Sequence, residues 1–147
     1  MSFHFARVIT APDAVIPTRH TSRSAGYDFT AYLTVPATVP PGQQVVLRTG
    51  IKAYMPPDWV LLLIARSSVG IKRHLMIPNG LGVIDADYAD NPDNDGEIFL
   101  ALYNMGPESQ VIAPGERLAQ GIFVPFGRVD EEPPSQPRRG GIGSTGF

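Results

Sequence analysis

The chain contains no cysteine in its 147 residues. This absence excludes disulfide bonds, thiolate nucleophiles and zinc–thiolate centres. It also suits a reducing cytoplasm, which would be the host cytoplasm if a virus or phage encodes the chain. The three histidines, His4, His20 and His74, are scattered and show no metal-ligand spacing. We therefore expect neither a disulfide-stabilised fold nor a histidine–cysteine metal centre.

Long hydrophobic runs and an excess of basic residues are missing as well. No apolar stretch approaches the roughly 20 residues that a membrane-spanning helix needs, and the first residues lack the apolar core of a signal peptide. The formal net charge is −2, whereas domains that bind nucleic acid nonspecifically are usually basic. We therefore expect neither a membrane nor nucleic acid among the partners.

Glycine and proline, by contrast, are abundant, with 15 residues of each. Helix interiors tolerate both poorly, so the composition predicts an all-β chain of short strands in a sandwich, jelly roll or barrel. The apolar run 59–65 predicts a buried strand, and the serine pair Ser67-Ser68 after it predicts the N-cap of a short helical turn. Further strands are predicted at 3–9, 27–35, 97–104 and 118–124, and the segment 44–55 is predicted as a strand pair or as one bent strand with a bulge at Gly50.

Residues 79–88 combine an Asn-Gly turn with a short apolar strand that ends in two acids. Gly82 permits close approach of the backbone to a ligand, and Asp85 and Asp87 lie on one face if the strand continues. A carboxylate held beside a water molecule can act as a general base. Two interpretations stay open here: a ligand-binding hairpin with a catalytic acid, or a hairpin with a polar exit turn.

Three other segments have features of phosphate or metal binding. An arginine and two hydroxyls follow a buried strand at 66–68, which suits phosphate but also an ordinary ion pair and cap. The glycine-rich segment 138–147 can surround an anion with backbone N–H groups, or can be a disordered tail. Asp28, at the start of a strand, can help to order a magnesium ion or its waters, or can be an Asx-turn residue.

Five blocks of the sequence together resemble the trimeric dUTP nucleotidohydrolase (dUTPase) family. They occur in the order expected for that family: AGYD at 25–28, RSS at 66–68, NGLGVIDADY at 79–88, GERLAQ at 115–120 and GGIGSTG at 140–146. The resemblance implies a jelly-roll-like β-barrel of short strands that forms a homotrimer, with each site built from several subunits. It implies a β domain at 1–130, followed by a flexible linker and a glycine-rich arm at 131–147 that closes over the active site.

The activity implied by the resemblance is Mg²⁺-dependent hydrolysis of dUTP to dUMP and pyrophosphate, which keeps uracil out of DNA and supplies dUMP for thymidylate synthesis. Asp85 resembles the residue that activates the attacking water, and Asp28 the residue that supports the metal through water. The residues implied for the base and sugar are Asn79, Gly82, Tyr88 and Ile142. Those implied for the phosphates are Arg66, Ser67, Ser68, Gln120, Arg138, Arg139, Gly143, Ser144 and Thr145.

The chain departs from the family pattern at two places. The family commonly continues the Asp-Tyr pair with Arg-Gly, whereas here residues 89–95 intervene and form an expected exposed acidic loop, which can bind a cation or a partner or be a longer turn. Ile142 stands where the family has a phenylalanine that stacks on uracil, and Phe147 is an alternative cover for the base. Two alternative functions are a nucleotide-gated regulatory protein that binds a protein partner and a dCTP deaminase-related enzyme.

Overall fold

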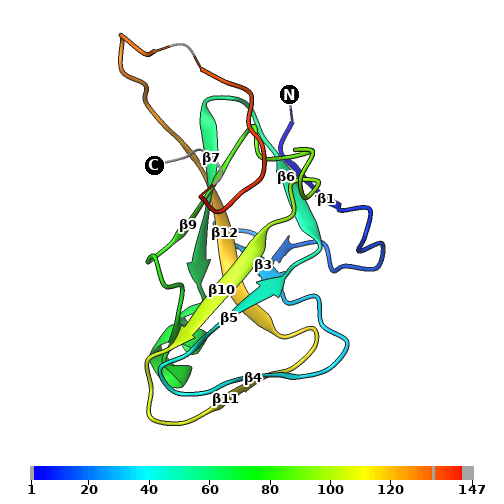
Figure 1. Cartoon of the computed structure of the whole chain (residues 1–147), viewed down its shortest axis with the longest axis vertical. Helices are drawn as coiled ribbons and strands as arrows, with labels where there is room; N and C mark the ends of the chain where they lie inside the picture. The colour runs from blue at the N-terminus through cyan, green and yellow to red at the C-terminus, as the bar shows by residue number, and fades with distance from the viewer. Residues whose placement is uncertain (1, 134, 144–147) are drawn as a thin grey trace.

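The computed structural model describes residues 2–133 and 135–143. Within them lie twelve short strands and a single π-helical turn (Figure 1). The strands are β1 (His4–Arg7), β2 (Thr18–Arg19), β3 (Tyr27–Thr30), β4 (Ala37–Val39), β5 (Gln44–Arg48), β6 (Ile51–Tyr54), β7 (Trp59–Ala65), β8 (Leu75–Met76), β9 (Gly82–Asp85), β10 (Phe99–Asn104), β11 (Gln110–Ile112) and β12 (Arg117–Pro125), and the turn is η1 (Ser68–Lys72). No helix in the described ranges is long and apolar enough to cross a membrane.

The strands pair antiparallel in four groups. The largest has the order β2-β3-β12-β7-β9, a second has the order β5-β10-β8, and two pairs join β1 to β6 and β4 to β11. In Figure 1, β5 and β10 run diagonally across β7 and β12. Buried side chains from both layers form one hydrophobic core, including Leu61 and Leu118 from one layer and Leu47 and Leu100 from the other.

Strand β7 is the centre of the fold and the support of the hairpin at 79–88. Leu61 and Leu63 are fully or almost fully buried, and each such leucine contributes about 1.5–3 kcal/mol relative to an exposed one. One edge of β7 pairs with β12, and the other pairs with β9. The short edge strand β9 is therefore fixed to the most buried strand of the sheet, which makes it a rigid place for a functional side chain.

The all-β prediction is confirmed, as is the strand at 59–65. The segment 44–55 is two strands in different sheets, and Gly50 is the junction between them, with its N–H donating to the buried Glu97 carboxylate at 2.9 Å. The predicted N-cap position is confirmed, since Ser67 directly precedes the helical turn η1, although its side chain makes no capping hydrogen bond. The two-stranded ladder of β4 and β11 was missed because its strands are three residues long and flanked by prolines.

Candidate functional site

A cavity of about 380 Å³ lies between the hairpin, the C-terminal segment and the β5–β10 layer. Asn79, Gly82 and Asp85 line it from the hairpin, and Phe99 lines it from β10. Its volume falls within the range of about 300–1,000 Å³ that is usual for small-molecule sites. The structure thus gathers most of the residues predicted for base and sugar binding around one space.

The acids of the hairpin are placed by the end of β9. Asp85 is the last residue of β9 and pairs with Val60 of β7. The chain then turns, with the Tyr88 N–H donating to the Asp85 carbonyl at 3.1 Å. Asp87 therefore lies beyond the strand, and the strand geometry that was expected to place both acids on one face does not continue to it.

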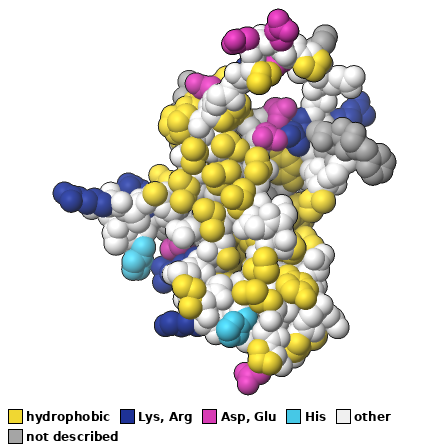
Figure 2. Space-filling view, turned by 90° about the vertical axis from the view of Figure 1, so that its left-hand side faces the viewer, with side chains coloured by type: hydrophobic (Ala, Val, Ile, Leu, Met, Phe, Trp, Pro, Cys, Tyr) yellow, Lys and Arg dark blue, Asp and Glu magenta, His cyan; other side chains and the backbone are white. Residues whose placement is uncertain are grey.

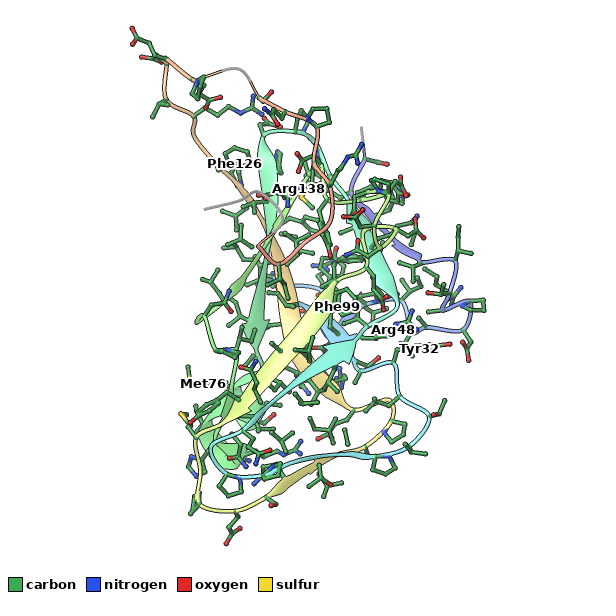
Figure 3. All side chains as sticks on the ribbon, in the orientation of Figure 1. Tyr32, Arg48, Met76, Phe99, Phe126 and Arg138 are labelled. Carbon is green, nitrogen blue, oxygen red and sulfur yellow. The ribbon has the colours of Figure 1, made fainter. Side chains whose placement is uncertain are left out.

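Arg138 joins these two acids to the C-terminal segment (Figure 3). Its guanidinium donates to Asp85 through Nη2 and to Asp87 through Nε, the latter at 2.7 Å. The side chain of Arg138 is only 16% exposed, whereas Arg139 is exposed. Of the two arginines predicted as phosphate contacts, Arg138 is thus the one that lies at the cavity in this structure.

The glycine-rich arm, which we define as residues 138–143, closes one side of the cavity. Gly141 lies so near Tyr88 that a Cβ atom there would approach the tyrosine hydroxyl to 3.0 Å. Ile142 and Gly143 also line the cavity, although Ile142 is 89% exposed and so covers little of it. The predicted contacts of Ser144 and Thr145, and the alternative cover by Phe147, lie outside the described residues.

Tyr88 forms the floor between the arm and the loop that follows. It is 9% exposed, its hydroxyl donates to the Glu97 carbonyl at 2.6 Å, and Asn94 Nδ2 donates to the hydroxyl at 2.9 Å. Burial raises the pKa of Tyr88 above its ordinary value of 10.0. The phenol therefore stays protonated at neutral pH, and its ring orientation is fixed by two hydrogen bonds.

The segment 89–96, which we call the acidic loop, is only in part the exposed loop that was expected, because Asp90, Pro92 and Asp93 are exposed and the other five residues are not. Asn91 and Gly96 are buried, and Lys52 Nζ donates to Asp90 at 2.5 Å and to Asp95 at 2.8 Å. Gly96 has a φ of +78°, and a Cβ atom there would lie 2.5 Å from the Cα atom of Ala89. The rest of the loop is less exposed than predicted because Lys52 of β6, which lies far away in the sequence, binds two of its aspartates.

The charges of this cluster support one another. Hydrogen bonds from Lys52 hold the pKa values of Asp90 and Asp95 below the ordinary 3.8, with Tyr54 helping at Asp90 and the Ile9 N–H helping at Asp95. Burial alone lowers the pKa of Lys52, but its bonds to the two aspartates outweigh this effect and raise the pKa above 10.5. All three groups are therefore charged at neutral pH.

The residues predicted for phosphate and metal form a second group, which lies elsewhere. Arg66 Nε lies 3.3 Å from Asp28 Oδ1, and Arg117 Nη1 donates to Asp28 Oδ2 at 3.2 Å. Gln120 is the cross-strand partner of Asp28, and the exposed Ser67 and Ser68 follow Arg66 at the start of η1. None of these residues lines the cavity beside Asp85.

The strand register gives the separation of the two groups. Asp28 and Asp85 lie on β3 and β9, three strand spacings apart in the sheet. Asp28 aligns through Gln120 with Ile64, whereas Asp85 aligns with Val60, four residues further along β7. With strands about 4.8 Å apart and a rise of about 3.3 Å per residue, the two Cα atoms lie roughly 20 Å apart.

The fold and the site define a class of protein. A nearly all-β chain presents a nucleotide-sized cavity with a carboxylate at the end of an edge strand, a glycine-rich arm at its rim and a separate arginine-rich patch, as expected for jelly-roll-like nucleotide hydrolases. The dUTPase family model matches residues 12–146. The chain belongs to the dUTPase family, which confirms the predicted enzyme class and jelly-roll-like fold, although the described strands form no closed barrel.

Individual relatives agree with this assignment. The deoxyuridine 5'-triphosphate nucleotidohydrolase of Lactococcus lactis is 46% identical over 133 residues, covering 89% of this chain and 87% of the relative. The protein of the same name from Paraburkholderia phymatum is 36% identical over 137 residues, covering 89% and 88%. The crystal structure of the dUTPase from Streptococcus mutans superposes with a TM-score of 0.81 at 39% identity, covering 87% of this chain and 99% of that one.

Four residues near the site were not singled out from the sequence. Asn91 and Asn94 bind the backbone and the hydroxyl of Tyr88, and their Asn-Pro-Asp-Asn context is a known Asx-turn signal that could have indicated an ordered loop. Arg117 lies within a recognised block but received no role, and it pairs with Asp28. Lys52 carries no local signal, because only the tertiary fold brings it to the acidic loop.

Proposed function

We propose that this protein hydrolyses dUTP to dUMP and pyrophosphate. The observation that carries the proposal is the cavity in which Asn79, Asp85, Tyr88 and the arm meet, in a chain of the dUTPase family. Removal of dUTP keeps uracil out of DNA, and the dUMP product supplies thymidylate synthesis. We assign the chemistry to an Asp85-activated water that attacks the α-phosphorus in line with the leaving pyrophosphate.

Arg138 occupies the Asp85 carboxylate in this scheme until the nucleotide binds. Its guanidinium pairs with Asp85 and Asp87 in the described structure. A triphosphate offers stronger bidentate partners for a guanidinium than two separate carboxylates do. The arriving phosphates therefore draw Arg138 away, and Asp85 is left free to accept a proton from the attacking water.

The base and the sugar occupy the remaining part of the cavity. Asn79 and the backbone next to Gly82 read uracil, and the wall of the hairpin rejects the methyl group of thymine. Tyr88 supports deoxyribose and leaves no room for a 2′-hydroxyl. Since Gly141 and Arg138 lie over Tyr88, the arm shifts when the sugar enters and then closes again with Ile142 over the base.

The predicted Mg²⁺ fits this chain as an ion held mainly by the nucleotide. The described residues contain no group of three or more His, Asp or Glu side chains that could hold a metal, and both carboxylate oxygens of Asp28 face arginines. Mg²⁺ commonly binds substrate phosphates and keeps several waters, so Asp28 would hold one of these waters. When bound, the ion neutralises charge on the phosphates during attack.

A homotrimer explains how the two groups of site residues serve one nucleotide. Neighbouring phosphates of one nucleotide are a few ångströms apart, whereas Asp28 and Asp85 of one chain are separated by roughly 20 Å. Figure 2 shows a broad area of hydrophobic side chains on one face, and the exposed apolar residues include Val46 of β5 and Val83 of β9. Large exposed apolar areas mark interaction surfaces, which supports assembly of each site from several subunits.

One assay tests the proposed function directly. Pyrophosphate release is measured with dUTP, dTTP, dCTP and UTP, each with and without Mg²⁺, and ammonia release from dCTP is followed in parallel. We expect rapid release from dUTP only, with Mg²⁺ present. Comparable turnover of UTP would remove the role given to Tyr88, and ammonia release would favour the deaminase-related alternative.

The regulatory alternative gains no support from the acidic loop, since Lys52 binds two of its three aspartates.

A further inference from the structure

The acidic loop contacts both Tyr88 and the arm, although the scheme above gives it no task. We propose that Asn91 is a positioning residue for dUTP hydrolysis, whose side-chain amide holds the arm at the cavity by accepting a hydrogen bond from the Gly140 N–H. This inference rests on the proposed function, because the arm matters to catalysis only if the cavity binds the nucleotide.

A single buried side chain joins three segments here. Asn91 is 5% exposed. Its Nδ2 donates to the Tyr88 carbonyl at 2.8 Å and to Asn94 Oδ1 at 2.6 Å, whereas its Oδ1 accepts from the Gly140 N–H at 3.2 Å. The same oxygen also accepts from the N–H groups of Asp93 and Asn94, at 3.1 and 3.3 Å. The loop alone already satisfies this amide, so the hydrogen bond from the Gly140 N–H favours the closed position of the arm only by its own contribution, that of one hydrogen bond.

The hydrogen bond at Gly140 fixes which arm residues meet the hairpin. Two residues before it, Arg138 reaches Asp85 and Asp87. One residue after it, Gly141 packs against Tyr88. A shift of the arm by one residue would move the guanidinium away from the acids and bring a side chain against the tyrosine. Asn91 therefore sets the register in which the arm presents its arginine.

The loop can hold the arm because the loop itself is anchored. Lys52 binds Asp90 and Asp95 from β6, and the Ile9 N–H donates to Asp95 Oδ2 at 3.0 Å. Asn91 lies between these two anchors, and its carbonyl accepts from the Asp95 N–H at 3.0 Å. The inserted segment thus serves the chain's own arm, and its aspartates fold the loop around Lys52.

The test uses the full chain and three variants: Asn91→Ala, Asn91→Asp and, as a matched control, Asp93→Ala at an exposed position of the same loop. Trypsin cleaves after Arg139 if the arm is open, and cleavage after the exposed Arg128 serves as the internal reference. Asn91→Ala removes the hydrogen bond to Gly140 together with four bonds within the loop and to Tyr88. Loss of the Gly140 bond alone predicts about fivefold faster cleavage after Arg139, so we expect at least that increase in Asn91→Ala. Asn91→Asp keeps an acceptor for Gly140, so it should regain part of the protection, and Asp93→Ala should match the parent chain.

The kinetic readout separates this inference from the proposed function. In Asn91→Ala, kcat for dUTP should fall by no more than the factor by which the closed arm is destabilised, because fewer arms are closed at any moment. Equal cleavage after Arg139 in Asn91→Ala and the parent chain, or an equal rise after Arg128 from general loosening, would overturn the role of Asn91. If the arm is protected from trypsin but the protein does not hydrolyse dUTP, the proposed function is refuted. The role of Asn91 in holding Gly140 would remain.

Discussion

The two groups of predicted site residues are arranged very differently within one chain. The hairpin group, consisting of Asn79, Asp85, Tyr88 and the arm, surrounds one cavity and is tied together by Arg138 and Asn91. The phosphate group, consisting of the predicted Asp28, Arg66 and Gln120 together with Arg117, lies at the other end of the same sheet, where its charges pair with one another. The first group is a recognisable pocket, and the second is a charged surface patch.

This difference shows that the base and sugar contacts and the phosphate contacts lie on separate parts of one chain. A pocket for a base and a sugar needs walls, and one chain supplies them from the hairpin, β10 and the arm. A site for phosphates needs mainly positive charge and donors, which can remain solvated on a surface until a nucleotide arrives. We infer that the phosphate group of one subunit meets the hairpin group of another, and each prediction below tests one side of this division.

The largest expected effect is on the hairpin side, in Asp85→Asn. Removal of the proposed base should lower kcat by roughly 10²- to 10⁴-fold while dUTP still binds. Asp87→Asn is the control, because Asp87 shares Arg138 with Asp85 but has no assigned contact with the water; it should lose far less. Both are measured by pyrophosphate release and by binding of a non-hydrolysable dUTP analogue. A similar loss in both variants would mean that the pair acts only through Arg138.

The second prediction addresses the division itself. Arg66→Ala and Asp85→Asn should each be nearly inactive alone, but oligomers formed from an equal mixture should regain about a quarter of the parent rate. That fraction is expected for random assembly when each site takes one group from each of two subunits. The measurement is dUTP hydrolysis after co-expression, with each variant assembled alone as control. No recovery would indicate that both groups serve a site within one chain.

The sequence predicted the composition of both groups better than their arrangement. Asp85, Tyr88, Arg66 and Gln120 were found because they lie in contiguous blocks, where local spacing carries the signal. Their division was not predictable, because it depends on strand order: β3 and β9 lie at different positions of a sheet whose pairing cannot be read from residues 27–30 and 82–85.

The acidic loop shows a different limit. Its residues are charged and turn-forming, so local reasoning predicted exposure. Lys52 and the Ile9 N–H hold Asp90 and Asp95 through contacts separated by 38 and 86 residues in the chain, so the loop is less exposed than expected. Gly96 received no role from the sequence, although its positive φ and its closeness to Ala89 show a tightly folded segment. Long-range contacts, which no local pattern records, decided this region.

The third prediction tests whether the loop supports the hairpin side, using Gly96→Ala. The substitution introduces both a strained φ and a backbone clash at 2.5 Å, and strain alone costs about 1–3 kcal/mol. Gly42→Ala is the matched control, since Gly42 has a similar φ of +73° with open space around it. Thermal unfolding should show the larger loss for Gly96→Ala, together with weaker binding of dUTP. Equal losses would indicate that the loop packs loosely.

The fourth prediction concerns the cover of the base, in Ile142→Phe. Ile142 is 89% exposed beside the cavity, and a phenylalanine can offer a flat face to uracil. Aromatic stacking contributes about 0.5–1.5 kcal/mol beyond area, so dUTP should bind a few-fold to about tenfold more tightly. Ile142→Leu controls for size without adding a ring and should change affinity little. Unchanged affinity in Ile142→Phe would place the base elsewhere than beneath residue 142.

The smallest expected effect is a pH dependence of stability that arises from the acidic loop beside the hairpin group. The pKa values of Asp90 and Asp95 are lowered from 3.8 by Lys52, so their contribution to stability is complete above about pH 4 and disappears as pH falls through the lowered values. The raised pKa of Lys52 keeps the contribution intact until the pH exceeds about 10.5. The stability difference between the parent chain and Lys52→Met should therefore be constant near neutral pH and shrink below pH 4.

Thermal unfolding between neutral pH and pH values below 4 measures this difference. Lys72→Met, at the chain's other lysine, is the control, and its stability difference from the parent chain should not change with pH. A flat difference for Lys52→Met would mean that the lysine contributes packing alone, and the loop would then hold the arm without help from its charges.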